Sequence, residues 1–225
     1  MRNSAIVLRW AFLLGAILGL TVFAIAQTGP NTSGLVVIVP VANMYSRSSL
    51  DADVVSQAIY GTTVTLLEEK EVWVRVKTPD DYPGWIESAG LRRLAVDEKP
   101  YASSGKIAHV DNLFANLCRE PSVTRHAPMI TVPFETRLEV IAPGEGRSQS
   151  WLQVRLPDGR SAWIQAGDVT VDLKPLSIEE CIALAKKFLG ITYTWGGMSS
   201  FGYDCSGFME MLIRPIDELH AAPEK

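Results

Sequence analysis

Residues 73–86 read WVRVKTPDDYPGWI, and residues 151–164 read WLQVRLPDGRSAWI. Each copy places two tryptophans 12 residues apart, on either side of a Pro-Asp pair. Aromatic and β-branched residues that flank a Pro-Asp turn are typical of two paired β-strands. Because the pattern occurs twice, the sequence indicates two copies of one structural unit.

A second match lies upstream of each copy. Val41–Tyr45 reads VANMY and Val110–Phe114 reads VDNLF, 69 residues apart, whereas the tryptophan segments are 78 residues apart. The second copy therefore holds about nine more residues, which we assign to a loop over residues 119–128. Two all-β units of about 60 residues, over residues 35–96 and 104–172, predict two small β-barrels.

The repeats resemble the bacterial SH3-like domains of cell-wall proteins. The first copy carries the resemblance in Asn43–Ser46, in Tyr60–Thr62 and in Gly84–Ile86, and the second copy is altered in its middle. The resemblance implies that the tryptophans lie mostly in the cores. Tyr45 and Tyr60 are the candidates for an aromatic wall that binds a cell-wall peptide.

The N-terminal segment predicts export. After Arg2 and Arg9 come 17 residues without a charge, Trp10 to Ala26, which end in an Ala-x-Ala cleavage pattern. This is typical of a signal peptide over residues 1–26, with an uncleaved membrane anchor as the alternative. A polar linker follows over residues 27–34. We expect the rest in the periplasm, cell wall or extracellular space, with membrane contact only through an uncleaved segment.

Charge and cysteine content exclude two classes of partner. The net charge is −4 and no basic stripe occurs, so no nucleic-acid partner is expected. Cys118, Cys181 and Cys205 are not at metal-ligand spacing, so we expect no metal and no cofactor. The odd number leaves at least one free thiol. Cys181 is expected in a core, and Cys118 in a buried or half-buried strand or loop.

A helix is predicted after the second repeat. Ser177 and Glu180 form a capping box at its start, and Gly190 can end it with positive φ. Six side chains at helical spacing predict one buried face: Ile178, Cys181, Ile182, Ala185, Phe188 and Leu189.

A second helix is predicted to begin at Cys205, with Asp204 as its N-cap, and to end before Pro215. A helix N-terminus stabilises a thiolate and can hold an oxyanion with its unpaired N–H groups. Cys205 is therefore a candidate nucleophile, and a structural cysteine at a helix start is the alternative.

Residues 190–197, GITYTWGG, and 204–208, DCSGF, follow the first helix. This arrangement resembles the NlpC family of papain-like cell-wall cysteine peptidases over residues 177–213. The resemblance implies a mainly β protein with an α+β C-terminal part, in which residues 175–225 are the helical portion of a papain-like domain.

The resemblance also implies roles for individual residues. Cys205 matches the nucleophile, Asp204 and Ser206 match residues that bind polar groups of the substrate, and Tyr193, Trp195 and Gly196 shape the site. The implied substrates are peptidoglycan stem peptides, cleaved after γ-D-glutamate, and members with two SH3-like repeats prefer a free N-terminal L-alanine.

One feature departs from the family. Its base is a His on a strand well downstream of the Cys, yet only 20 residues follow Cys205 and they show no strand pattern. His220 lies in that tail with nothing predicted to hold it at Cys205. His109 and His126 fall in the second repeat, where surface or loop positions are expected.

Three hypotheses follow from this departure. The chain is an exported stem-peptide endopeptidase by descent, with a truncated and inactive catalytic domain. Alternatively, it is a non-enzymatic wall-binding protein that acts through its SH3-like repeats. Thirdly, a second polypeptide supplies the missing sheet and His.

Overall fold

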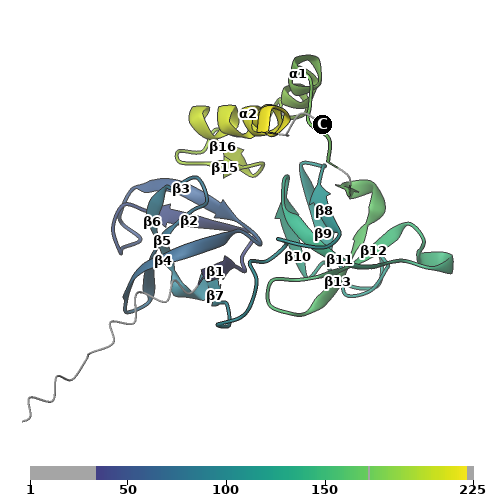
Figure 1. Ribbon diagram of the computed structural model, residues 1–225, viewed down its shortest axis with the longest axis horizontal. Coiled ribbons are helices and arrows are strands. Elements are labelled where there is room, and N and C mark those ends of the chain that lie inside the picture. The colour runs from purple at the N-terminus through teal and green to yellow at the C-terminus, as the bar shows by residue number, and fades with distance from the viewer. Residues whose placement is uncertain (1–33, 172, 222–225) are drawn as a thin grey trace, which may run out of the picture. The chain divides into compact units, whose positions relative to one another are not determined.

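The computed structural model describes residues 34–171 and 173–221 (Figure 1). The predicted signal peptide over residues 1–26 lies outside the described residues. Within the described part of the chain, no helix is long and apolar enough to cross a membrane.

The first repeat forms one antiparallel sheet, drawn in purple to blue in Figure 1, with strand order β3-β2-β6-β5-β4-β1-β7. Its strands are β1 (Gly34–Val37), β2 (Val41–Tyr45), β3 (Val54–Ile59), β4 (Thr63–Lys70), β5 (Trp73–Lys77), β6 (Pro83–Glu87) and β7 (Leu91–Arg93). A short 3-10 helix, Ser88–Gly90, precedes β7. The quoted stretch of residues 73–86 forms the β5–β6 hairpin, as its turn residues predict. Met44, Val76 and Ile86 are among the side chains buried in its core.

The second repeat has the same plan, with its strands split between two sheets. The five-stranded sheet has the order β13-β12-β11-β8-β14, and β9 pairs with β10. The strands are β8 (Ile107–Val110), β9 (Phe114–Leu117), β10 (Ile130–Pro133), β11 (Arg137–Pro143), β12 (Trp151–Arg155), β13 (Ser161–Gln165) and β14 (Val169–Thr170). Two 3-10 helices, Gly146–Ser148 and Ala166–Asp168, complete it. The loop between β9 and β10 contains the extra residues predicted at 119–128.

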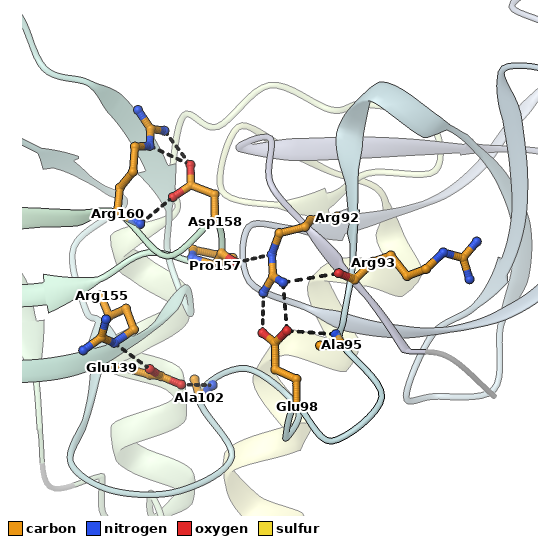
Figure 2. A network of polar contacts seen from close by, with 10 residues as sticks. All are labelled: Arg92, Arg93, Ala95, Glu98, Ala102, Glu139, Arg155, Pro157, Asp158 and Arg160. Atoms are coloured by element: carbon orange, nitrogen blue, oxygen red, sulfur yellow. Dashed lines mark hydrogen bonds and ion pairs between the residues drawn. The ribbon is translucent and has the colours of Figure 1, made fainter. Parts of the chain in front are cut away.

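The two SH3-like units are joined by polar contacts from the linker region. Figure 2 shows Arg92 between the two units: its Nε donates to the Pro157 carbonyl at 2.6 Å, and both its terminal nitrogens bind the Glu98 carboxylate. Tyr101 donates its hydroxyl to the Arg155 carbonyl at 2.5 Å. Tyr60, from the first unit, is buried in the core of the second.

The remaining elements are α1 (Ile178–Lys187), the short strands β15 (Met198–Ser199) and β16 (Gly202–Tyr203), and α2 (Cys205–Ala221). The predicted capping box is present, since Glu180 N donates to Ser177 Oγ at 3.3 Å and Ser177 N donates to Glu180 Oε2 at 2.8 Å. Gly190 has φ +92° just beyond the helix, as predicted.

The core beneath the two helices includes a residue from the second SH3-like unit. Phe134, in the turn between β10 and β11, is 8% exposed and packs with Leu184, Phe188, Tyr203 and Met211. Its ring meets that of Phe188 edge-on at 5.2 Å between centroids. The helical part therefore shares its core with the second SH3-like unit.

Two predictions for the helices were wrong. The buried face of α1 consists of Cys181, Leu184 and Phe188, whereas Ile178, Ile182 and Leu189 are exposed, because no described residue covers that side of the helix. The second helix does not end before Pro215 but continues through it to Ala221. Proline disfavours but does not forbid this, since it removes one backbone hydrogen bond and clashes with the preceding turn.

Candidate active site

Cys205 is the first residue of α2, and its side chain is exposed. Asp204 precedes the helix and caps it, because Gly207 N donates to Asp204 Oδ1 at 2.7 Å and Phe208 N donates to the Asp204 carbonyl at 3.0 Å. The predicted N-cap is thus confirmed. The helix dipole therefore presents partial positive charge at the position of the thiol.

The Asp204 carboxylate connects the helix to the segment before it. Its Oδ2 accepts from Gly196 N at 3.1 Å, and its Oδ1 also accepts from Ser206 Oγ at 2.8 Å. Burial alone would raise the pKa of Asp204, but the hydrogen bonds from Gly207, Ser206 and Gly196 lower it below its ordinary value. The carboxylate is therefore ionised at neutral pH and holds the two glycine-containing turns together.

The glycines of the site provide close backbone contacts. Gly196 has φ +68°, a conformation that favours glycine. A Cβ on Gly207 would lie 2.2 Å from the Gly197 carbonyl oxygen, so a side chain there has no room. Gly207 thus lets the 196–197 turn lie directly against the first turn of α2, which differs from the predicted role of admitting a substrate to the backbone.

A mostly apolar groove of about 520 Å³ lies beside Cys205, between α1 and α2. Its residues are Ile182, Ala185, Lys186, Phe188, Leu189, Gly190, Ile191, Thr192, Tyr193, Tyr203, Asp204, Cys205 and Phe208. The side chains that the sequence predicted as the buried face of α1, Ile182 and Leu189, line this groove instead. The volume is within the range of small-molecule sites.

The predicted site residues fall into two groups. Tyr193, Asp204 and Cys205 line the groove, while Trp195 (71% exposed), Gly196 and Ser206 lie beside it in the chain. Tyr45 and Tyr60 lie in the first SH3-like unit, where Tyr45 packs edge-on against Trp73 at 5.4 Å between ring centroids. Tyr60 is buried against the second unit, so a ligand role for either tyrosine stays a prediction.

Among the residues that line the groove, no histidine is present. His109 lies in β8 of the second SH3-like unit, and burial, followed by the charge of Arg137, lowers its pKa to about 4. His126 lies 3.4 Å from Glu120 in the β9–β10 loop. His220 belongs to α2, 15 residues after Cys205, so about 22 Å of helix separates the two positions. None of the three is placed to act as a base on Cys205.

Sequence reasoning missed the residues through which the SH3-like units hold this segment. Gln57 Oε1 accepts from Met198 N at 3.0 Å, and Ser200 Oγ accepts from Phe134 N at 3.0 Å. Each contact joins residues far apart in the chain. Neither Gln57 nor Ser200 belongs to a motif, so no local signal pointed to them. The described residues hold no cluster of His, Cys, Asp and Glu suited to a metal ion.

Two family models match the SH3-like units. Residues 44–91 match the bacterial dipeptidyl-peptidase SH3 domain, and residues 110–171 match the YKFC SH3b2 domain. Two curated relatives extend the similarity. A γ-D-glutamyl-L-lysine dipeptidyl-peptidase of Bacillus cereus is 28% identical over 71% of this chain and 49% of the relative. Dipeptidyl-peptidase 6 of Lysinibacillus sphaericus is 28% identical over 78% of this chain and 67% of the relative. The chain thus spans about half the length of the first.

Solved structures show the same fold. An NlpC/P60 family protein from Bacillus cereus matches with a TM-score of 0.66 and 24% identity, over 81% of this chain and 72% of the other. An NlpC/P60 endopeptidase from Photobacterium damselae matches with a TM-score of 0.57 and 14% identity, over 83% of this chain and 44% of the other. The SH3 matches, the curated relatives and the shared fold together place this chain with the NlpC-type cell-wall peptidases that carry two bacterial SH3 domains.

Proposed function

We propose that Cys205 is the nucleophile position of a peptidoglycan stem-peptide endopeptidase that cleaves after γ-D-glutamate. The observation that carries the proposal is the exposed thiol at the capped N-terminus of α2, beside the groove. The names of two relatives, γ-D-glutamyl-L-lysine dipeptidyl-peptidases, supply the substrate class.

The chemistry follows from that position. The Cys205 thiolate attacks the carbonyl carbon of the γ-D-glutamyl amide, a C–S bond forms, and the oxyanion meets N–H groups at the start of α2. When the C–N bond breaks, the leaving amine needs a proton, and water then hydrolyses the thioester. A general base that takes the thiol proton normally returns it to this amine.

The described groove supplies no histidine for that proton transfer. We therefore propose that the 225-residue chain by itself binds stem peptides but does not turn them over. A base would have to come from another polypeptide segment, as in the third hypothesis from the sequence. Without one, the loss in catalytic rate is several orders of magnitude, by comparison with removal of the base from a serine triad.

The test is release of L-lysine from L-Ala-γ-D-Glu-L-Lys, with the Cys205→Ala variant as the control and with added imidazole as an external base. The proposal predicts release by the wild-type chain only when imidazole is present. Release without imidazole that depends on Cys205 would contradict the missing base. Failure to release lysine even with imidazole would contradict the nucleophile role.

We also propose export, on the evidence of the sequence of residues 1–26. Cleavage after Ala26 would leave Gln27 at the N-terminus of a protein in the periplasm, cell wall or extracellular space. Mass spectrometry of the protein from its native host tests this. A chain that starts at Met1 and stays in the cytoplasm would contradict it.

The alternative function is cell-wall binding through the SH3-like units, without catalysis. It is favoured by the fact that both units are complete, with their own buried cores. Residues 34–171 and the full Cys205→Ala chain should then sediment equally well with purified peptidoglycan. If only the full chain sediments, the groove and not the SH3-like units binds the wall.

A further inference from the structure

The β15–β16 hairpin, which immediately precedes Cys205, is held by a side chain of the first SH3-like unit. Gln57, in β3, accepts hydrogen bonds at its Oε1 from Met198 N at 3.0 Å and from Ser199 Oγ at 3.4 Å. Met198 and Gln57 are 141 residues apart in the chain. The amide of Gln57 is therefore a direct link between the first unit and the hairpin.

The orientation of that amide is fixed by a second contact. Gln57 Nε2 donates to Asn43 Oδ1 at 2.9 Å, across the β2–β3 pair. With its nitrogen engaged by Asn43, the amide must present its oxygen to the hairpin. Both ends of the side chain are thus used, and the acceptor faces the Met198 N–H in advance.

One residue further along, the chain contacts the helix cap. The Gly197 carbonyl accepts from Asp204 N at 3.0 Å, and the same oxygen lies against Gly207 in the first turn of α2. A displacement of Met198 would therefore move Gly197 and, with it, the backbone of Asp204.

The other side of this turn rests on β3 itself. A Cβ on Gly196 would lie 3.1 Å from the Val54 carbonyl oxygen and 3.3 Å from Ser56 N. Gly196 N in turn donates to Asp204 Oδ2. Residues 196–198 are consequently enclosed between the β3 strand and the start of α2.

We infer that Gln57 is a positioning residue for Cys205: it fixes the 196–198 turn, and that turn fixes the Asp204 cap on which the nucleophile sits. The first SH3-like unit thereby sets the geometry of the helix start through one amide. The link matters for catalysis only if the proposed function holds, but the link itself is measurable without any turnover.

The second SH3-like unit supplies a separate anchor to the same hairpin. Ser200 Oγ donates to the Leu113 carbonyl and accepts from Phe134 N. This contact lies at the turn of the hairpin, on the far side of Ser199 from Met198. Loss of Gln57 should therefore loosen Met198 and Asp204 while leaving Ser200 anchored.

The experiment is amide hydrogen exchange followed by NMR on the full 225-residue chain, for Gln57→Met, Gln57→Glu and the control Gln165→Met. Gln165 is exposed and makes a 3.5 Å contact to Asp168 within its own unit. In Gln57→Met, exchange at Met198 N–H should accelerate about tenfold, the factor for one net hydrogen bond, and Asp204 N–H should follow by a smaller factor. The β2 and β3 amides should keep their rates.

Gln57→Glu is the rescue variant. Its carboxylate still accepts from Met198 N–H, and Asn43 can turn its amide to donate, so the rates at Met198 and Asp204 should stay within about twofold of wild type. Gln165→Met should change neither amide.

Three outcomes would overturn the inference. Met198 exchange in Gln57→Met may equal that of the wild-type chain, which means that the amide does not hold the hairpin. Met198 may accelerate while Asp204 does not, which means that the turn does not transmit to the cap. Exchange may accelerate across β2 and β3 as well, or equally in Gln57→Glu, which means that Gln57 only stabilises its own unit.

Discussion

Replacing Phe134 by alanine tests whether the second SH3-like unit completes the core beneath α1 and α2. Phe134 lies in the β10–β11 turn yet packs with Phe188, Tyr203 and Met211. Phe→Ala in a core costs about 3–5 kcal/mol, which includes the lost burial and the cavity that remains. Because the residue is 8% exposed and lies in a turn that can partly collapse, we expect about 3 kcal/mol.

The loss should appear in the helices rather than in the sheets. We expect the free energy of exchange of the Leu184 and Met211 amides to fall by about 3 kcal/mol, and that of the β12 and β13 amides to change by less than about 1 kcal/mol. The matched control is Phe114→Ala in β9, where the ring is 56% exposed and the expected cost is within about 0.5 kcal/mol.

Two results would refute this reasoning. A loss below about 1 kcal/mol at Leu184 and Met211 would show that the helices do not depend on the phenylalanine. An equal loss in Phe114→Ala would show that the effect is a general weakening of the second unit.

Three further predictions concern single side chains. Asp204→Ala should lower stability by about 1–2 kcal/mol at pH 7 through loss of the N-cap, and the difference from wild type should shrink as the pH falls below 3.8, since the depressed pKa of Asp204 means that its contribution is lost on protonation; urea titrations at several pH values measure both. Glu98, whose pKa is lowered to about 2 by its hydrogen bonds from Arg92 and the Ala95 amide, contributes stability that is present above pH 4.5 and lost toward pH 2, so Glu98→Gln should flatten the unfolding curve in that window, and an unchanged slope would count against the Arg92 link. The pKa of His109 is lowered from 6.5 to about 4, so the unfolded chain takes up this proton first and stability should fall between pH 6.5 and pH 4; His109→Gln should remove that part of the slope, and retention of the full slope would contradict the burial of the imidazole.

The sequence predicted those features that depend on local chemistry. The capping box at Ser177, the Asp204 cap and the β5–β6 hairpin each depend on residues within a few positions of one another, and each is present. The two SH3-like units were predicted because a repeat shows itself in one sequence.

The features that the sequence did not predict depend on residues far apart in the chain. Periodicity identifies the apolar side chains of α1 but not which of them are covered, so Ile182 and Leu189 were assigned to a core although they line a groove. Gln57 and Phe134 act on partners 141 and at least 50 positions away, and nothing adjacent to them in the sequence indicates it.

Pro215 shows the opposite limit, since its local preference was overridden. Its ring disfavours a helix interior, yet α2 passes through it and ends at Ala221. The same continuation moves His220 away from Cys205, which strengthens the proposal that this chain holds the nucleophile without its base.

The most direct test of the account is affinity labelling of Cys205. The label is L-Ala-γ-D-Glu with a chloromethyl ketone at the γ-carboxyl position, and the matched control carries the same group on the α-linked L-Ala-L-Glu isomer. Because Cys118 and Cys181 are buried, peptide mapping should find the adduct at Cys205. The account predicts that the γ-D-linked reagent labels Cys205 at least tenfold faster than the α-linked isomer. Equal rates for the two reagents, or labelling at another residue, would contradict the claim that Cys205 is the nucleophile position of a stem-peptide site.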